Sequence, residues 1–469
     1  MKKKIMIFLM LLFVFGVSKA NALSITSDYT LEEDINEQVV VDGANATINL
    51  NGHSITAPAN GALRVVNGAN VTVTGEGTIE SINNNGVVVD NGSTFTLESG
   101  NIRSVEFGVF VAKNSTFTMN GGTIVTSDNC GVGGNGSNTE VYKDYTININ
   151  GGTITSNITT SGFVSCGVYH PNRGTVNVAG GTINSTNGPG IVQRAGTLNI
   201  TGGTINSSEI TPGIKGKACD AGILVNASAI VVDKEANYPE MATMVTKISS
   251  DAKLNGAVKA VETMGDNVVV ELTGGVYSDE PEEGTIPEGY NAYEVMGGDN
   301  DGKYVVVKES DLKNQVINGI VPEESVDEGD AAKIAEIIKD KYNLASYYDV
   351  LLVKVTPDGD IVGVVSESDE VTVTLGIPEN LPKVKDGYAR KYYVVRVHNG
   401  KATLIKDVTD NGNGTVSFKS GEFSTYALAY EDVQKTVDVP KTFDPIFIYI
   451  SLLSVSVIGI IGKKVIKNN

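Results

Sequence analysis

The chain contains no tryptophan, 3 cysteines and 3 histidines in 469 residues, and aromatic residues make up only 6% of it. Basic residues are also scarce, since 36 Lys and Arg stand against 55 Asp and Glu, a formal net charge of −19. This balance excludes a nucleic-acid-binding surface, which needs a basic patch or stripe. With 41% hydrophobic residues the chain is not a disordered polyampholyte, and its 53 glycines lack the three-residue period of collagen. What remains is a β protein rich in Gly, Asn and Thr.

Long apolar runs occur only at the two ends. The first extends from Ile5 to Val17, after lysines at 2–4 and before Ala20 and Ala22. A basic start, a short apolar core and small residues two apart are typical of a secretory signal peptide. We therefore expect signal peptidase to remove residues 1–22. The alternative is a membrane anchor, but about 13 apolar residues are short for a span that needs about 20.

The second apolar run extends from Pro445 to Gly462, and three lysines follow it. Eighteen largely apolar residues can form a transmembrane helix with the lysines on the cytoplasmic side. The segment before the run reads Val439-Pro440-Lys441-Thr442-Phe443-Asp444. Residues 435–469 thereby resemble the LPXTG-type sorting signal of Gram-positive (Firmicutes) surface proteins, with Val439 in place of Leu and Phe443 in place of Gly. The resemblance implies that a sortase cuts after Thr442 and joins it to the cell envelope. A simple transmembrane anchor is the alternative.

Both alternatives place the bulk of the chain outside the cell. The two ends hold seven of the 36 basic residues and one of the 55 acidic ones, so residues 23–442 carry a net charge of −25. Such a surface repels anionic polymers and attracts divalent cations only diffusely. No specific calcium motif is present in the sequence.

The region between the ends contains an internal repeat marked by glycines. A Gly-Gly-Thr-Ile unit recurs with its second glycine at Gly122, Gly152, Gly181 and Gly203. It alternates with a Gly followed by Val or Ile, at Gly86, Gly108, Gly131, Gly167, Gly190 and Gly222. The basic period is 22 to 23 residues, and alternating apolar and Thr or Asn residues around the markers predict three short strands in each period.

Three short strands cannot bury an apolar face alone, but stacked periods form a parallel β-helix with like strands about 4.8 Å apart. The Leu-rich pattern of the other common solenoid is absent, and an antiparallel sandwich would not keep residue types in register. Residues 23–310 resemble the right-handed parallel β-helix superfamily, the pectate-lyase-like fold, with about eight coils. Right-handed winding also agrees with the preference for right-handed crossovers.

Many members of this superfamily cleave acidic polysaccharides, so the resemblance raises the possibility of an enzyme. Glycosidases use two carboxylates about 5 to 9.5 Å apart, which on stacked coils requires acids at equivalent positions. Neither of two columns of equivalent positions keeps a carboxylate: Asp90, Ala112, Asn135, Pro171 and Arg194; and Glu98, Asn120, Asn150, Ala179 and Thr201. We therefore predict no catalytic residues. A polysaccharide lyase or glycoside hydrolase whose acids meet only in the fold is the alternative.

The sequence also gives little support for a metal site or a disulfide. None of the histidines has a Cys or His at metal-ligand spacing, and we expect no metal or cofactor. Cys130 and Cys166 each precede a Gly-Val pair and should be neighbours on adjacent coils, although stacked parallel side chains aim poorly for a disulfide. Cys219 is offset from them, and the odd number of cysteines favours packed thiols.

Insertions in the repeat are the best candidates for binding. Those at Asn157–Cys166 and Ser208–Ala221 enlarge the same corner of nearby coils. We predict a contact patch for a sugar or a protein there, formed by Tyr142, Phe163, Tyr169, His170 and Arg173. The alternative is that the insertions lengthen these loops without giving them a function.

The repeat ends near residue 310. We predict a linker at 311–344 with an amphipathic helix at Asp330–Tyr342, then a small antiparallel β-sandwich at 345–434. The stretch Phe423–Leu428 resembles the last strand of modules that precede sorting signals, which implies a stalk. The predicted all-β protein is thus a non-catalytic adhesin, anchored to the cell wall or membrane, that displays a β-helix to a host or environmental glycan or protein.

Overall fold

The computed structural model describes residues 22–136, 144–157, 166–209, 228–233, 244–260 and 267–435. Residues 1–21 of the predicted signal peptide, Cys219, and the predicted sorting signal with its apolar run lie outside these residues. Within the described part, no helix combines the length and the apolar character needed to cross a membrane. The chain divides into two compact units, Met1–Pro287 and Glu288–Asn469, which are taken in turn.

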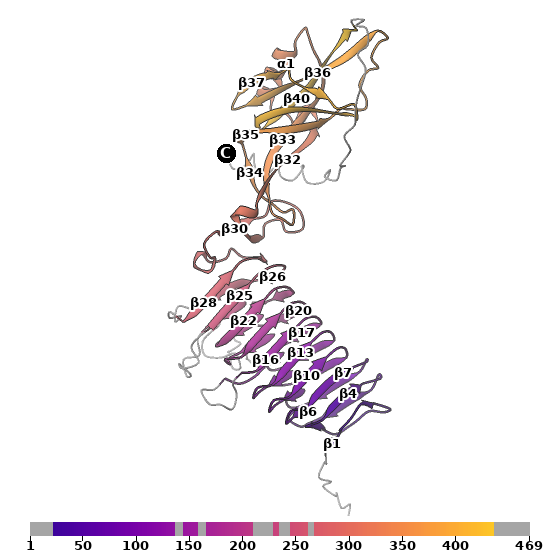
Figure 1. The fold of residues 1–469 in the computed structure, drawn as a ribbon, viewed down its shortest axis with the longest axis vertical. Helices are drawn as coiled ribbons and strands as arrows, with labels where there is room; N and C mark the ends of the chain where they lie inside the picture. Colours follow the sequence, from indigo (N-terminus) through magenta and orange to yellow (C-terminus); the bar gives the residue numbers. More distant parts are fainter. Residues whose placement is uncertain are drawn as a thin grey trace, which may run out of the picture. The chain divides into compact units, whose positions relative to one another are not determined.

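The first unit consists of three parallel sheets built by stacking (Figure 1). The first sheet contains β1 (Leu23–Ser24), β3 (Val39–Asp42), β6 (Leu63–Val66), β9 (Val87–Val89), β12 (Val109–Val111), β15 (Val132–Gly133), β18 (Val168–His170), β21 (Ile191–Gln193), β24 (Ser228–Val232) and β27 (Ala257–Ala260). The second contains β2 (Tyr29–Thr30), β4 (Asn45–Asn49), β7 (Asn70–Thr74), β10 (Thr94–Leu97), β13 (Thr116–Met119), β16 (Thr146–Ile149), β19 (Thr175–Val178), β22 (Gly196–Ile200), β25 (Met244–Ile248) and β28 (Val268–Leu272). The third contains β5 (Ser54–Ala57), β8 (Thr78–Ser81), β11 (Asn101–Ser104), β14 (Thr123–Thr126), β17 (Thr153–Ser156), β20 (Thr182–Ser185), β23 (Thr204–Asn206), β26 (Lys253–Asn255) and β29 (Val276–Tyr277), and the short 3-10 turn η2 (Glu283–Thr285) follows.

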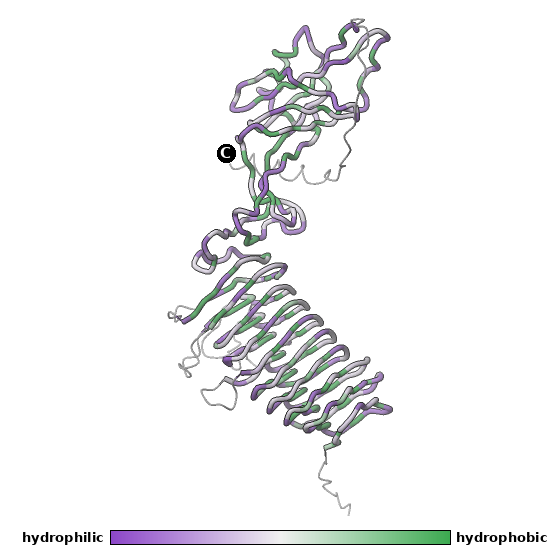
Figure 2. The backbone as a smooth tube through the Cα atoms, viewed as in Figure 1, coloured by the Kyte–Doolittle hydropathy of each residue, from purple (hydrophilic) through white to green (hydrophobic). Residues whose placement is uncertain are grey.

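The stacking keeps like residues in columns. Phe95 pairs with Phe117, and Phe117 with Ile147, all fully buried, while the Thr and Asn residues beside them pair with one another on the outer face. This period-two alternation of apolar and polar residues is visible along the coils (Figure 2). The predicted parallel β-helix stacking is thereby confirmed. The predicted number of coils is too low, because the first two sheets have ten strands each and the terminal coils lack the Gly-Gly-Thr-Ile marker.

The two glycine markers are needed for different reasons. Gly152 has φ +79°, and a Cβ there would lie 2.7 Å from the carbonyl oxygen of Gly122 on the preceding coil. Gly131, from the other marker, leaves room for the next coil, since its Cβ would lie 2.2 Å from Cγ2 of Ile154. The strict alternation of the markers therefore follows from the way in which one coil packs on the next.

The second unit is mainly antiparallel. Its elements are β30 (Tyr290–Glu294), β31 (Tyr304–Lys308), η3 (Glu309–Asp311), β32 (Lys313–Val321), η4 (Glu323–Ser325), α1 (Glu328–Ile338), β33 (Asn343–Val355), β34 (Ile361–Val365), β35 (Glu367–Gly376), β36 (Tyr388–His398), β37 (Lys401–Ile405), β38 (Thr409–Asp410), β39 (Thr415–Glu422) and β40 (Thr425–Gln434). One sheet has the order β32-β33-β40-β36-β37 with β34 beside β33, and a smaller sheet has the order β35-β39-β38. Their facing side chains share one core, to which Tyr348, Val373 and Phe418 contribute. The region is therefore sandwich-like, as predicted.

The predicted linker is only partly confirmed. Residues 313–321 are not a linker, because β32 pairs with β33 along nine residues and belongs to the sheet. The helix begins at Glu328, where the Asp327 side chain accepts hydrogen bonds from the N–H groups of Gly329 and Asp330. Ile334 is its fully buried contact with the core. The first unit also ends at Pro287 rather than near residue 310.

Candidate functional site

The most regular outward surface of the described coils lies on the second sheet. We define the Thr/Asn face as the outward residues of β10, β13, β16, β19 and β22. These are Thr94, Thr116, Thr146, Thr175 and Thr197 in one column, and Thr96, Thr118, Asn148, Asn177 and Asn199 in the other. Every one is half-buried and neutral, whereas their neighbours along each strand are fully or almost fully buried.

The asparagines of this face form a ladder that runs in one direction. Asn199 Nδ2 donates to Asn177 Oδ1 at 3.0 Å, and Asn177 Nδ2 donates to Asn148 Oδ1 at 2.9 Å. Asn148 Nδ2 then donates to Thr118 Oγ1 at 3.3 Å. A second ladder on the third sheet runs the same way from Asn255 through Asn206 and Asn184 to Thr155. The amide dipoles of each ladder are aligned, so each bond polarises the next.

The ladder uses only part of the hydrogen-bonding capacity of each amide. An Asn side chain has two N–H donors and an oxygen with two lone pairs, and each ladder contact takes one donor and one lone pair. The remaining donor and lone pair of each internal amide belong to the half-buried face, which also carries a column of threonine hydroxyls. The Asn column ends in charge, because Lys247 and Glu271 follow Asn199 in register and form an ion pair at 3.1 Å. The face can thus donate and accept hydrogen bonds without a net charge.

The predicted contact patch does not assemble as expected. Tyr142 and Phe163 lie outside the described residues. Tyr169 is only 9% exposed and packs with Phe107, Cys130 and Cys166, and His170 is 0% exposed. Of the three patch residues that the structure describes, Arg173 is the exposed one, with a 3.7 Å ion pair to Asp144. The prediction that His170 belongs to a surface patch is therefore wrong.

His170 is buried because of its position in β18. It pairs in register with Gln193 and, through it, with the buried Val232, so its side chain faces the interior of the coils. Its Nδ1 lies 3.0 Å from the hydroxyl of Tyr145, which is also fully buried. Burial lowers the pKa of His170 to about 4 and raises the pKa of Tyr145 well above its usual value. The sequence signal for this inward position is the two-residue spacing of Val168 and His170, which places both side chains on the same face of the strand.

Interior polar residues near His170 also have partners. Gln193 Nε2 donates to the carbonyl oxygen of Gly196 at 2.9 Å, and the Thr246 hydroxyl donates to Gln193 Oε1 at 2.5 Å. Arg194 and Asp233 form an almost fully buried ion pair at 3.5 Å. These contacts satisfy buried groups and do not present a reactive atom to solvent. In the part of the chain that the structure describes, no cluster of three or more His, Cys, Asp or Glu could hold a metal ion.

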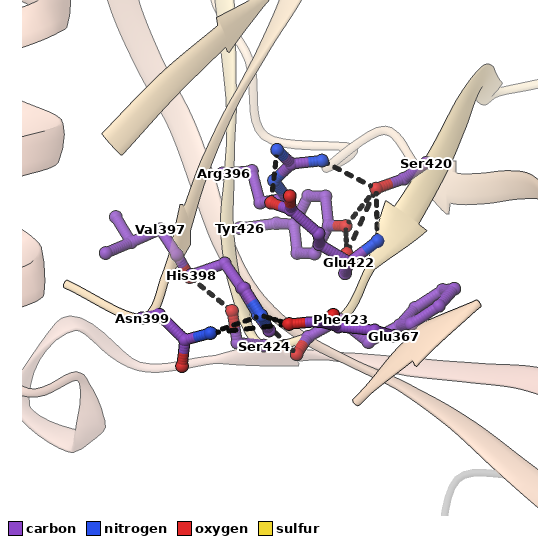
Figure 3. A network of polar contacts seen from close by, with 10 residues as sticks. All are labelled: Glu367, Arg396, Val397, His398, Asn399, Ser420, Glu422, Phe423, Ser424 and Tyr426. Atoms are coloured by element: carbon purple, nitrogen blue, oxygen red, sulfur yellow. Dashed lines mark hydrogen bonds and ion pairs between the residues drawn. The ribbon is translucent and has the colours of Figure 1, made fainter. Parts of the chain in front are cut away.

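A second polar network lies in the antiparallel unit (Figure 3). Arg396 on β36 donates through Nη1 to Ser420 Oγ at 3.0 Å and forms an ion pair with Glu422, both on β39. His398 Nε2 lies 3.2 Å from a carboxylate oxygen of Glu367 on β35. The network therefore joins the larger sheet to the smaller one at two points.

A cavity of about 710 Å³ adjoins this network and is lined by Arg396, Lys406 and Lys419 together with Glu370 and Asp407. Both positive and negative side chains line it, so it favours no ligand of one charge. The sequence offered no signal for this grouping, because its members come from separate strands. We interpret the Arg396 network as a structural connection between the two sheets of the antiparallel unit.

The fold and the faces together define a class, a protein of stacked parallel β coils joined to an antiparallel, sandwich-like module. No protein-family model, no curated protein and no solved structure matches the chain.

Proposed function

We propose that this chain is an exported, envelope-attached surface protein of the Gram-positive type whose β-helix is a non-catalytic adhesion module. Its ligand is a neutral glycan, free or carried on a host or environmental protein, bound along the Thr/Asn face. The observation that carries this proposal is the pair of neutral, half-buried Thr and Asn columns repeated on five successive coils.

The chemistry of the face supports a hydroxyl-rich ligand. Sugar hydroxyls both donate and accept hydrogen bonds, as do the threonine hydroxyls and the remaining amide groups of the ladder. The net charge of −25 on residues 23–442 disfavours acidic polysaccharides and leaves neutral ones. A face without aromatic platforms gains little at each contact, so we expect affinity to depend on several coils acting together.

The ends support display at the surface. Signal peptidase would release the chain after Ala22, and a sortase would join Thr442 to the cell envelope, with the apolar run from Pro445 as the membrane anchor before transfer. By the resemblance of its repeat, the β-helix is right-handed and of the pectate-lyase-like type. The antiparallel module then acts as the stalk.

The experiment is a glycan array with the purified full-length chain and a matched pair of double variants. Thr146→Val with Thr175→Val removes two hydroxyls from the centre of the Thr/Asn face while keeping strand propensity. Thr153→Val with Thr182→Val makes the same change at paired outward positions on the third sheet. We expect the first variant to lose about 5- to 150-fold in binding and the second to retain it, since each of the two lost hydrogen bonds costs about 0.5–1.5 kcal/mol.

Two outcomes would contradict the proposal. Equal binding by both variants would show that the Thr/Asn face is not the site. Sustained release of reducing ends from a bound glycan would show that the β-helix is an enzyme.

A further inference from the structure

The coils bring two cysteines to the same level of the stack. Val132 pairs with Val168, and the N–H of Gly131 donates to the carbonyl oxygen of Cys166 at 3.2 Å. Cys130 and Cys166 are therefore neighbours on adjacent coils, as the repeat predicts, and both are 0% exposed. Their Sγ atoms lie 2.9 Å apart, so the side chains converge where poor alignment was expected.

The backbone already has the spacing that a disulfide needs. Neighbouring parallel strands lie about 4.7–4.9 Å apart, which falls inside the 4.4–6.8 Å range of Cα separations in disulfides. The Sγ atoms lie 2.9 Å apart, so they must approach by only about 0.85 Å to reach the roughly 2.05 Å of a sulfur–sulfur bond, which rotation of the side chains can supply. No movement of one coil relative to the other is required.

The surroundings of the pair are apolar. Phe107, Val192 and Val231 belong to the same buried cluster as the two cysteines. Such surroundings disfavour the thiolate and exclude reductants, so a bond formed while the coils stack would persist in the folded protein.

We propose that Cys130 and Cys166 form an inter-coil disulfide in the exported protein. The two thiols lose two protons and two electrons to an external disulfide, which is reduced to two thiols as the Sγ–Sγ bond forms. The bond joins residues 36 positions apart and closes a covalent loop that contains β15, β16 and β17. The disulfide would link the two adjacent coils covalently, next to the predicted insertion at Asn157–Cys166. The oxidising location rests on the proposed export, whereas the geometry does not.

The test maps the bond in the full-length chain. The purified protein is unfolded with reductant, refolded in the presence of oxidised glutathione so that the thiols can react while the coils stack, then denatured, alkylated without reductant, digested and examined by mass spectrometry. We expect one linked peptide pair that joins Cys130 to Cys166, lighter by two hydrogen atoms than the reduced peptides, and an alkylated Cys219. Alkylation of Cys130 and Cys166 in the oxidised sample, or a link from either to Cys219, would overturn the proposal.

Thermal unfolding gives a second measurement. Protein refolded under reducing conditions should melt roughly 5–10 °C lower than protein refolded with oxidised glutathione, because the loop constraint on the unfolded chain is absent. The Cys219→Ser variant should show the same drop, and the Cys130→Ala, Cys166→Ala double variant should show none. A drop that persists in the double variant would contradict the assignment. Neither measurement involves a glycan, so a failure of the Thr/Asn face and a failure of the disulfide are distinguishable.

Discussion

At the scale of single residues, position on a coil decides what each side chain does. Gly152 is confined by its backbone conformation and by the preceding coil, whereas Gly92 has φ +77° but open space around its missing Cβ. His170 is confined by the alternation of its strand, which turns a titratable ring into the interior. Both residues therefore affect stability more than their chemical type suggests.

The two glycines provide a matched comparison. Gly152→Ala should lower the free energy of unfolding by about 2–4 kcal/mol, from the positive φ together with the clash. Gly92→Ala should cost only about 1 kcal/mol, from the φ alone. Urea denaturation followed by circular dichroism measures both values. Equal losses would contradict the packing explanation of the Gly-Gly marker.

His170 predicts a dependence of stability on pH. The pKa is about 6.5 in the unfolded chain and about 4 in the fold, so the unfolded state binds the proton first as the pH falls. Stability should therefore fall between pH 6.5 and 4 by at most about 3 kcal/mol from this group, and should not change further below pH 4. Urea unfolding of wild type and His170→Gln across this range isolates the contribution as the difference between the two curves. Parallel curves would show that the ring is not a buried neutral group.

At the scale of elements, the coils are held by apolar columns inside and by amide ladders outside. The two Asn ladders run toward the N-terminal coils and end on threonine hydroxyls, Thr118 and Thr155. Each internal ladder residue makes one bond as donor and one as acceptor, whereas the last residue of the first ladder, Asn199, donates to Asn177. The internal positions should therefore contribute more to coil stacking.

This difference is measurable with a single substitution at each position. Asn177→Val breaks two ladder bonds and Asn199→Val breaks one, and both keep a residue suited to a strand. We expect the first to be less stable than the second by about 0.5–1.5 kcal/mol. Urea denaturation gives the values, and a larger loss at Asn199 would contradict the ladder model.

At the scale of the whole molecule, two compact units with different sheet types share one chain. The first is a stack in which each coil contacts its neighbours, and the second has a two-sheet core around residues such as Phe418. Each unit has its own buried residues, so we expect two separable unfolding transitions.

Calorimetry of a core variant tests this separation. Phe418→Ala should destabilise the antiparallel unit by about 3–5 kcal/mol and lower one transition by several degrees. The transition of the coils should remain where it is, and Gly152→Ala should show the opposite pattern. A shift of both transitions by either variant would show that the units unfold together.

Much of the fold could be predicted because the repeat is local. The spacing of Gly122, Gly152 and Gly181 reports which residues stack, and the alternation on each strand reports which of them face inward. The same local pattern does not identify the candidate face, because alternating Thr and Asn residues predict the solvent-facing side of a strand whether or not that side binds a ligand. The Arg396 network could not be predicted, because contacts between β36 and β39 follow from pairing across the whole module.

The sequence by itself determined the period, the inward columns and the alternation of the glycine markers, since each depends on residues within one or two coils. Only the tertiary structure decided that Cys130 and Cys166 converge to 2.9 Å, that His170 is excluded from solvent, and that Lys313–Val321 is a strand. Those outcomes depend on side-chain directions and strand partners, which are set by packing between segments distant in the chain.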